Sequence, residues 1–353
     1  MNAPRHPIDM TEAPMQTAEA TGYSDPDQCR RERTGVFARS WQFLTHESQL
    51  PDAGSWVAET IAGYPIVVVR DEAGALNGFH NVCRHRAGPL TDGPAGRCEG
   101  ALVCRYHGWR YALDGRLKQA RDFGAAPGFD PRDFSLFPIQ VQTWRGLVFV
   151  RLDDRDDPLA DWVAPLESRL AGADWSHLKV ALVRAHDLAC NWKTYVENYL
   201  EGYHVPVMHP SLDAEIDSSR YRVDMDGYVA LHEAPQRRPD AVYNGLWAWL
   251  WPNLGINVYG EADGVMIERI APIGAAATRL DYLYLTPGGK PVSAETLAMS
   301  DAVLAEDRWI VERVQANLDA GIYRTGRLSP RHEQAVAAFQ GFVAEATSVE
   351  PTA

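Results

Sequence analysis

Two Cys/His pairs in the first third of the 353-residue chain restrict its possible folds more than any other feature. One residue separates Cys83 from His85, and two residues separate Cys104 from His107. Short β patterns surround both pairs: "YPIVVVRD" and "ALNGFHNV" flank one turn, and "GWRYAL" and "RLKQA" flank another. Each pair therefore lies at or just after the end of a predicted strand, where loops can bring ligands together.

We expect these four side chains to bind metal, and two kinds of site fit them. Two Cys and two His suit tetrahedral Zn²⁺, but zinc motifs usually place the Cys together and the His together. Here each pair supplies one Cys and one His, as in a Rieske [2Fe–2S] centre, with Cys83 and Cys104 on one iron and His85 and His107 on the other. The order of ligands favours iron and sulfur, in a centre that passes single electrons onward. Cys98 has no His at a matching spacing and is predicted to be a loop or core thiol.

The composition argues against several other classes of protein. A formal net charge of −13 without a Lys/Arg block argues against nucleic-acid binding. No apolar run reaches the roughly 18 residues that a membrane span needs. Five Cys in a chain of this length, with no secretion signal, indicate a reducing compartment. We expect a soluble, cytoplasmic protein.

Changes in pattern along the chain predict an α+β protein with two domains. Residues 1–20 are expected to be a disordered tail, and residues 21–40 a helix that packs on the second domain. Residues 41–154 are expected to form a small antiparallel β domain, and the charged run Asp153 to Pro158 marks its end. Residues 155–353 form the second domain. Its helices are predicted near residues 159–170, 191–204 and 294–320, with another opening at Ser329-Pro330.

A second candidate metal site lies in the segment "ENYLEGYHVPVMHP". His204 and His209 would face different sides of a continuous helix, but Pro206 prevents that continuity. The helix is expected to end near His204, so that the bent chain brings His209 back toward it. The alternative is that either His is a hydrogen-bonded core residue.

A non-haem iron site that reacts with O2 needs two His and one carboxylate. In "AVLAEDRWIVERVQANL" Asp307 falls on a predicted apolar stripe, whereas Glu306 lies about 100° away from it. A carboxylate that faces the core is costly unless it is paired or binds metal. Asp307 is therefore the better candidate ligand, and an internal salt bridge is the alternative. The predicted stripe consists of Val303, Ile310, Val314 and Leu318.

With both constellations in view, the chain resembles the α subunit of the Rieske non-haem iron oxygenases, also called ring-hydroxylating oxygenases. The resemblance extends from "FARSWQFLTHESQLPDAGSW" through both motifs to "GRLSPRHEQAVAAFQ". It implies a β-sandwich Rieske domain and a helix-grip, START-like catalytic domain with a curved antiparallel sheet and long helices. It also implies a Rieske [2Fe–2S] cluster and a mononuclear non-haem Fe(II) as cofactors, with O2 as cosubstrate.

The resemblance also assigns roles to individual residues and implies partners. Glu201 matches a carboxylate that joins the first iron His to a Rieske His of a neighbouring subunit, although many ring dioxygenases have Asp there. The implied assembly is a homotrimer or a multiple of one. The implied electron donor is a separate NAD(P)H-dependent reductase, with or without a ferredoxin, since this sequence has no flavin or nicotinamide fingerprint. The implied metal ligands are Cys83, His85, Cys104 and His107 for the cluster, and His204, His209 and Asp307 for the iron.

Within the family, "NVCRHRAGPL" and "LWPNLGINVYG" resemble the choline, betaine and carnitine monooxygenases. Those enzymes hydroxylate a carbon beside a quaternary nitrogen, which leads to N-demethylation, C–N cleavage or alcohol oxidation. Cationic substrates favour aromatic faces. Strand alternation places Trp247, Trp249 and Trp251 on one side, and Tyr203 is a further candidate. Carnitine enzymes have Glu where this chain has Val205, which argues against carnitine itself.

Three other functions stay open at this point. One is hydroxylation or dihydroxylation of an aromatic ring or an aryl acid, because the motif residues hold the metals and do not define the substrate. A more remote one is a non-catalytic Rieske electron carrier, in which the second domain has no chemical role. The last is a zinc-stabilised regulatory domain with a ligand-binding helix-grip fold.

Overall fold

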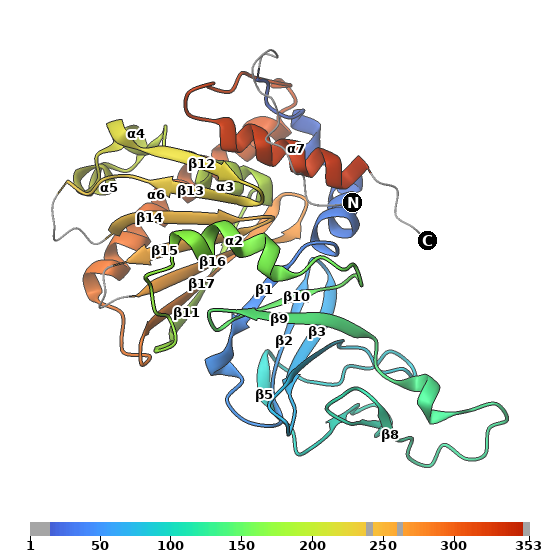
Figure 1. Cartoon of the computed structure of the whole chain (residues 1–353). Coiled ribbons are helices and arrows are strands. Elements are labelled where there is room, and N and C mark those ends of the chain that lie inside the picture. The colour runs from blue at the N-terminus through green and yellow to red at the C-terminus, as the bar shows by residue number, and fades with distance from the viewer. Residues whose placement is uncertain (1–14, 238–242, 260–263, 349–353) are drawn as a thin grey trace. The chain divides into compact units, whose positions relative to one another are not determined.

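The structure, a computed structural model, describes residues 15–237, 243–259 and 264–348 (Figure 1). The chain divides into two compact units: the smaller is Ala38–Asp156, and the larger comprises the chain on both sides of it. The domain boundaries expected at residues 41 and 154 lie close to these limits. Of the helices in the described ranges, none is long and apolar enough to cross a membrane.

The smaller unit is built of two antiparallel sheets. Seven strands form one sheet in the order β1-β10-β9-β4-β3-β2-β5, and β6-β7-β8 form the other. The run "IVVV" in β3 is fully buried because alternate residues serve two cores: Val67 and Val69 pack with Phe79, whereas Ile66 and Val68 pack in a second cluster. A continuous apolar run is therefore compatible with a strand covered on both faces.

The strands of the smaller unit are β1 (Gln42–His46), β2 (Ser55–Ile61), β3 (Tyr64–Arg70), β4 (Leu76–His80), β5 (Ala95–Arg97), β6 (Leu102–Val103), β7 (Arg110–Tyr111), β8 (Leu117–Gln119), β9 (Pro138–Trp144) and β10 (Leu147–Arg151). Two short 3-10 helices accompany them, η3 (Glu47–Gln49) and η4 (Pro131–Phe134).

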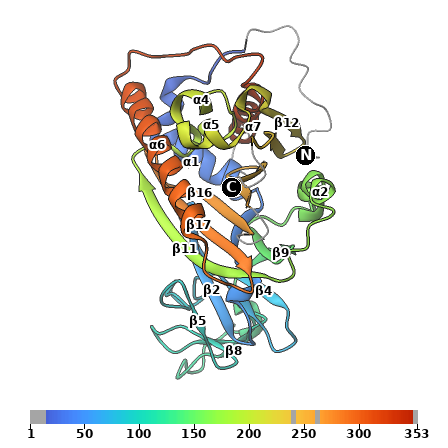
Figure 2. The ribbon, with the colours of Figure 1, turned by 90° about the vertical axis from the view of Figure 1, so that its left-hand side faces the viewer.

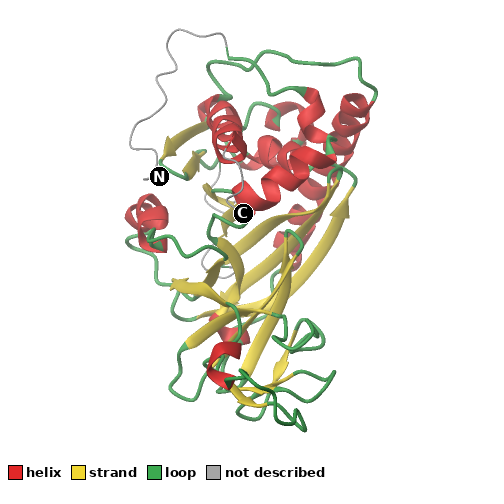
Figure 3. Cartoon of the chain, turned by 90° about the vertical axis from the view of Figure 1, so that its right-hand side faces the viewer, coloured by secondary structure: helices red, strands yellow, loops and turns green. Residues whose placement is uncertain are grey.

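The larger unit has a curved antiparallel sheet of seven strands in the order β11-β17-β16-β15-β14-β13-β12. The long helix α6 runs along one face of this sheet, and α2 lies on the opposite face (Figure 1 and Figure 2). Figure 3 shows the same strands in yellow with the helices of the unit in red beside them. The short helices α3, α4 and α5 lie on the α6 side, where α3 packs on α6 and β16, and α5 packs on α6.

The strands of this unit are β11 (Leu178–Leu188), β12 (Arg222–Asp226), β13 (Val229–Glu233), β14 (Tyr243–Leu250), β15 (Leu254–Tyr259), β16 (Val265–Gly274) and β17 (Ala277–Pro287). Its helices are η1 (Ala20–Tyr23), α1 (Pro26–Glu32), the π-helix η2 (Arg33–Phe37), α2 (Leu159–Arg169), α3 (Trp192–Tyr199), α4 (Val205–Met208), α5 (Pro210–Glu215), η5 (Ser218–Arg220), α6 (Ala294–Asp319) and α7 (Gln334–Ser348).

Two helix predictions differ from the structure at their ends. The helix predicted for residues 191–204 is shorter, because α3 ends at Tyr199. The Ser329-Pro330 pair opens a turn and not α7, which begins at Gln334. Ser329 Oγ accepts from the backbone N–H of Arg331 and His332 at 3.3 Å, so the Ser caps this turn locally. The bounds of α2 and α6 agree with the predicted ones.

The N-terminal segment is held in the larger unit. Residues 1–14 of the expected disordered tail lie outside the described residues, whereas the next few are ordered: Ala20 N–H donates to the Arg324 carbonyl at 2.9 Å. In α1, Glu32 is buried and accepts from Trp192 Nε1 at 2.8 Å. It also pairs with buried Lys193 at 2.5 Å. The helix expected in residues 21–40 therefore contacts α3.

Candidate functional site

Three side chains that the sequence predicts as iron ligands meet in the larger unit. His209 Nε2 lies 3.0 Å from His204 Nε2 and 3.1 Å from Asp307 Oδ1. The ligand atoms of all three residues lie within 4.8 Å of one another. His209 and Asp307 are buried, and His204 is half-buried. Two imidazoles and one carboxylate are the donor set of a non-haem iron site with open coordination positions.

A break in the helical chain brings the two His together. After α3 ends at Tyr199, His204 stands at the N-cap of the short helix α4, and Pro206 lies in its first turn. His209 follows α4 and is the N-cap of α5, which begins with Pro210. Proline is best tolerated in the first turn of a helix, and Pro206 and Pro210 both lie in such a turn, so each favours the start of a new short helix there. The helical chain is interrupted at residues 200–204, before Pro206, and Pro206 lies within α4, so the interruption predicted at Pro206 is placed too late in the chain.

A carboxylate contacts the second ring nitrogen of each His. His204 Nδ1 contacts the carboxylate of Glu201, and His209 Nδ1 lies 2.7 Å from Glu306 Oε2. Because a carboxylate accepts hydrogen bonds, both rings carry their N–H at Nδ1 and keep a lone pair at Nε2. The two lone pairs and an oxygen of Asp307 then face one small space. Such a set of acceptors fits a bound cation.

The same charges affect the protonation of His209. Its burial disfavours the imidazolium, but the neighbouring carboxylates of Asp307 and Glu306 outweigh this cost and raise the pKa of His209 above its usual value. The pocket formed by these residues therefore favours positive charge at this point, as a cation-binding site requires.

Asp307 faces inward from α6, but the predicted apolar stripe is not the buried face of that helix. Val314 of the predicted stripe is exposed, whereas Asp307 shares its buried face with polar side chains. Ser300 Oγ lies 2.8 Å from the Tyr284 hydroxyl, and Gln315 Oε1 accepts from a backbone N–H at 2.8 Å. Apolar periodicity misplaced the face because polar residues with partners occupy it. The buried residues of α6 are Thr296, Ser300, Leu304, Asp307, Val311 and Gln315.

Sequence reasoning missed two residues that hold the candidate iron ligands in place. Glu306, set aside because it points away from the predicted stripe, contacts His209. Asn198 Nδ2 donates to Asp307 Oδ1 at 2.7 Å and so fixes that carboxylate. One signal for Glu306 was available: a His that binds metal usually donates its other N–H to a carboxylate, and Glu306 adjoins the predicted ligand.

A cavity of about 90 Å³ adjoins the three ligand residues. At roughly 10–15 Å³ for one water, it has room for a small organic molecule. Aromatic side chains from α3, β14 and the segment before β12 contribute to its wall, among them Tyr199, Tyr221 and Trp247. Glu201, Glu268 and Asp307 are its acidic residues, and the described lining residues include no Lys or Arg.

The aromatic residues predicted to bind substrate lie in different places. Of the three tryptophans, Trp247 lines the cavity, where its ring stacks on Tyr221 with centroids 6.0 Å apart. Trp249 and Trp251 pack instead against Phe339 of α7, at 5.7 and 6.0 Å. Tyr203 is 59% exposed and stacks on His332, outside the cavity wall. The alternation of residues in the strand predicted all three tryptophans on one face of the sheet, but α7 covers the part of that face where Trp249 and Trp251 lie.

The other predicted ligands lie on two tight loops of the smaller unit. Cys83 N–H donates to the Gly88 carbonyl at 2.8 Å, and Cys104 N–H donates to the Trp109 carbonyl at 2.9 Å. Both Cys are buried, at 2% exposure. A Cβ at Gly88 would lie 2.9 Å from Cys104 Sγ, so glycine leaves room beside the sulfur. This cradle fits a group bound between the loops.

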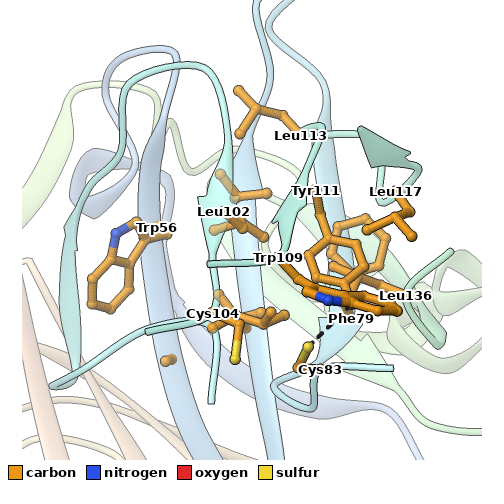
Figure 4. Packing of buried hydrophobic residues seen from close by; sticks show 14 residues of the cluster. Trp56, Phe79, Cys83, Leu102, Cys104, Trp109, Tyr111, Leu113, Leu117 and Leu136 are labelled. Atoms are coloured by element: carbon orange, nitrogen blue, oxygen red, sulfur yellow. Dashed lines mark hydrogen bonds between the residues drawn. The ribbon is translucent and has the colours of Figure 1, made fainter. Parts of the chain in front are cut away.

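Aromatic residues surround these ligands. The rings of His85 and His107 lie 4.6 Å apart, and His85 stacks on Trp109 at 4.9 Å. Figure 4 shows Cys83 and Cys104 on the same side of the hydrophobic cluster, beside Trp109 and Tyr111. Cys83 Sγ lies 3.2 Å from the Tyr111 hydroxyl. Two paired thiols and two paired imidazoles fit the donor set of a Rieske [2Fe–2S] cluster.

Comparison with known families identifies both parts of the chain. Residues 40–130 match the Rieske [2Fe-2S] domain, and residues 175–348 match the catalytic domain of the ring hydroxylating alpha subunit. The chain is 30% identical to the chloroplastic choline monooxygenase of Beta vulgaris over 328 residues, which cover 88% of this chain and 72% of that protein. It is also 30% identical to the carnitine monooxygenase oxygenase subunit of Escherichia coli (strain K12), over 87% of this chain and 86% of that protein.

Solved structures show the same architecture. The crystal structure of a quaternary ammonium Rieske monooxygenase in complex with an inhibitor is 26% identical to this chain, with a TM-score of 0.85, and covers 94% of this chain and 95% of its own. A naphthalene 1,2-dioxygenase bound to phenanthrene has a TM-score of 0.75 at 18% identity, with 95% of each chain covered. The second likeness concerns the fold alone.

Proposed function

We propose a substrate class for this chain, which belongs to the Rieske non-haem iron oxygenases and is the α subunit of such an enzyme. Its cofactors are a Rieske [2Fe–2S] cluster and a mononuclear non-haem iron, and O2 is its cosubstrate. The predictions of family, fold, cofactors and enzyme class are confirmed. A zinc-stabilised regulatory domain and a non-catalytic electron carrier do not account for a matched catalytic domain.

We assign the cluster to Cys83, His85, Cys104 and His107, and the iron to His204, His209 and Asp307. When bound, the iron supplies O2 activation with electrons from the cluster. The protein keeps the ligands in place: Glu201 orients His204, Glu306 orients His209, and Asn198 holds Asp307. Each of these contacts limits the rotation of a ligand, which favours one arrangement around the metal.

The substrate we propose is a small quaternary ammonium compound or related amine. The enzyme hydroxylates a C–H bond beside the nitrogen, which leads to N-demethylation or C–N cleavage. The observation that carries this proposal is the cavity beside the iron ligands, with aromatic rings in its wall and no Lys or Arg among its described lining residues. Aromatic faces attract a desolvated cation by about 2 kcal/mol or more. The choline and carnitine monooxygenases among its relatives support the same class.

The main alternative is hydroxylation of an aromatic ring or an aryl acid. An aryl acid would bring a carboxylate into a cavity that already contains acidic side chains, which is unfavourable without a cationic partner. A neutral aromatic ring has no such penalty, so charge argues against acids and experiment must separate neutral rings from amines. Carnitine carries its own carboxylate, and the same argument favours choline-like cations over it.

We further propose that electrons enter the iron site across a subunit interface of a homotrimer. In this path, His107 of the partner subunit passes an electron through Glu201 to His204. Two observations support it: His107 is exposed in the smaller unit, and Glu201 contacts the ring nitrogen of His204 that faces away from the other ligands. A separate NAD(P)H-dependent reductase is the proposed electron donor, and the cytoplasm the proposed location.

A substrate panel tests the proposed class. The purified holoenzyme, a surrogate reductase and NADH are incubated with choline, glycine betaine, carnitine, benzoate and naphthalene, and oxygen incorporation from ¹⁸O2 is scored by mass spectrometry. We expect incorporation with a quaternary amine and no incorporation with benzoate. Incorporation into benzoate or naphthalene alone would contradict the proposal. An Asp307→Ala enzyme is the control for oxygen uptake that does not depend on the iron.

A further inference from the structure

One buried carboxylate in the cavity has no role in the two metal sites. Glu268 lies on β16, an inner strand of the sheet between β15 and β17, and the residue is 3% exposed. It lines the cavity together with Met266, which is on the same face of the strand. Among the described residues, Glu268 Oε1 has no hydrogen-bond partner. A buried carboxylate oxygen without a hydrogen-bond partner lowers the stability of the folded protein, so its presence needs an explanation.

Two other carboxylates of the larger unit, one buried and one half-buried, do have partners. Glu32 pairs with Lys193 at 2.5 Å and also accepts from Trp192. Glu197, which lines a different pocket, accepts from the Tyr23 hydroxyl at 2.5 Å and from Gln340 at 3.0 Å. Glu268 differs because its open oxygen belongs to a residue in the wall of the substrate cavity. The missing partner can therefore be a molecule that enters the cavity.

The charges of the cavity leave Glu268 as the one acidic group that is free for a ligand among its described lining residues. Asp307 is committed to the iron, and Glu201 to the imidazole of His204. No Lys or Arg of the described lining residues is present to neutralise Glu268. Burial accordingly raises the pKa of Glu268 to about 7, and a cation beside the carboxylate would favour its ionised form.

The surroundings of Glu268 also suit a small cation. The hydroxyls of Tyr195 and Tyr282 lie 3.2 Å apart, and both residues line the cavity next to Glu268. Tyr282 is the cross-strand neighbour of Glu268 in β17. The carboxylate and the aromatic rings therefore border the same cavity as Asp307. Oxidation of a carbon beside nitrogen requires the nitrogen to lie close to the iron, and a cavity of this size satisfies that requirement.

We propose that Glu268 is the charge partner of the substrate's ammonium group and selects cations over neutral molecules of the same shape. The inference rests on the proposed substrate class and assigns the selection to one side chain. An ion pair formed in a desolvated cavity contributes more than a surface pair, so Glu268 should dominate the charge preference while the aromatic rings supply a smaller part.

Binding of a matched pair of probes tests this role. Choline and 3,3-dimethylbutan-1-ol have the same shape and differ in the charge at the quaternary centre. Isothermal titration calorimetry of the iron-loaded holoenzyme gives the ratio of their Kd values for the wild type and each variant. We expect the wild type to prefer choline by roughly tenfold or more, and Glu268→Gln to lose most of that preference. Glu268→Asp, which keeps the charge, should retain part of it.

Glu197→Gln is the matched control, since it neutralises a half-buried glutamate of the same unit outside the cavity. It should keep the wild-type ratio. A Glu268→Gln protein that melts cooperatively but keeps the full preference for choline would overturn this inference and leave the substrate class intact. The wild type could prefer neither choline over 3,3-dimethylbutan-1-ol nor tetramethylammonium over neopentane. In that case the substrate class itself is wrong, and the inference falls with it.

Discussion

Glu306 Oε2 lies 2.7 Å from Nδ1 of His209, so the residue next to one proposed iron ligand in α6 orients a second proposed ligand from another part of the chain. The contact joins α6 to the segment between α4 and α5. One stretch of helix thereby fixes both the carboxylate and an imidazole of the site. This coupling explains how a site assembled from separate short helices keeps its geometry.

Glu306→Gln should weaken iron binding. The amide can still contact His209, but it no longer favours a single ring tautomer, and contacts of this kind change metal affinity by roughly 10–100-fold. Competition with a chelator followed by iron analysis measures the loss. Glu295→Gln, an exposed carboxylate in the first turn of the same helix, is the control and should bind iron as the wild type does. Equal affinity of the Glu306→Gln and wild-type proteins would contradict the role of Glu306.

Asp307→Ala should remove the mononuclear iron and keep the cluster. The wild type is expected to carry about three irons and about two acid-labile sulfides, and the variant about two of each. Iron and sulfide assays on the same sample measure this, and the visible spectrum of the cluster should not change. Loss of both kinds of iron, or of neither, would disagree with the assignment of ligands to two separate sites.

The sequence was sufficient to propose both metal sites because most of the candidate ligands stand in short motifs whose spacing reflects local chain geometry. Cys83, Cys104, His204 and His209 follow this pattern. Asp307 was found through an apolar stripe that proved wrong, because Ser300 and other polar residues form part of the buried face. The prediction still selected Asp307 because the predicted apolar stripe and the buried face of α6 adjoin each other on the surface of the helix.

Residues that depend on long-range packing were beyond the reach of the sequence. Trp249 and Trp251 share a strand pattern with Trp247, but only the position of α7 decides which of them borders the cavity. Glu268 stands in the β pattern "VMIERIA" with no motif around it. Glu268 is buried, and its Oε1 lacks a hydrogen-bond partner, because of how the seven-stranded sheet packs with α3. A local sequence pattern does not contain that information.

Tyr111→Phe should lower the reduction potential of the cluster. The Tyr111 hydroxyl lies 3.2 Å from Cys83 Sγ, and a hydrogen bond to a ligand sulfur favours the more electron-rich reduced state. A net contribution of about 0.5–1.5 kcal/mol corresponds to roughly 20–65 mV for one electron. Redox titration followed by EPR measures the shift. Tyr64→Phe, a change in β3 of the same unit, is the control, and an unchanged potential in Tyr111→Phe would rule out this hydrogen bond.

Glu268→Gln should change how stability depends on pH. The unfolded carboxyl ionises near its ordinary pKa of about 4.3, whereas burial raises the folded pKa to about 7. The polar side chains of Tyr195, Tyr282 and Asn257 near the carboxylate favour its ionised form and so oppose this shift, and the charge of Asp307 adds to it. The folded state keeps a proton that the unfolded state releases, so stability is highest below pH 4.3 and falls as pH rises to 7.

Over that pH interval the ionisation of Glu268 should lower the free energy of unfolding of the wild type by on the order of 3 kcal/mol. Glu268→Gln has no carboxyl group at this position and should not show this loss. Urea unfolding between pH 5 and pH 8 measures the difference, and the variant should become the more stable protein at pH 8. Glu295→Gln should follow the wild type. Parallel curves for the wild type and Glu268→Gln would show that burial does not hold the proton on this group.

Lys193→Met should destabilise the larger unit by about 3–5 kcal/mol, because it leaves Glu32 buried without its cation. Lys193 and Glu32 have 5% and 2% exposed side chains and lie 2.5 Å apart, and Lys193 Nζ also donates to the Gly22 carbonyl at 3.0 Å. The double variant Lys193→Met/Glu32→Leu removes both charges and should recover part of the loss. Thermal unfolding measures both proteins. Equal destabilisation in the single and double variants would mean that the methionine disturbs packing and that the unpaired carboxylate contributes little.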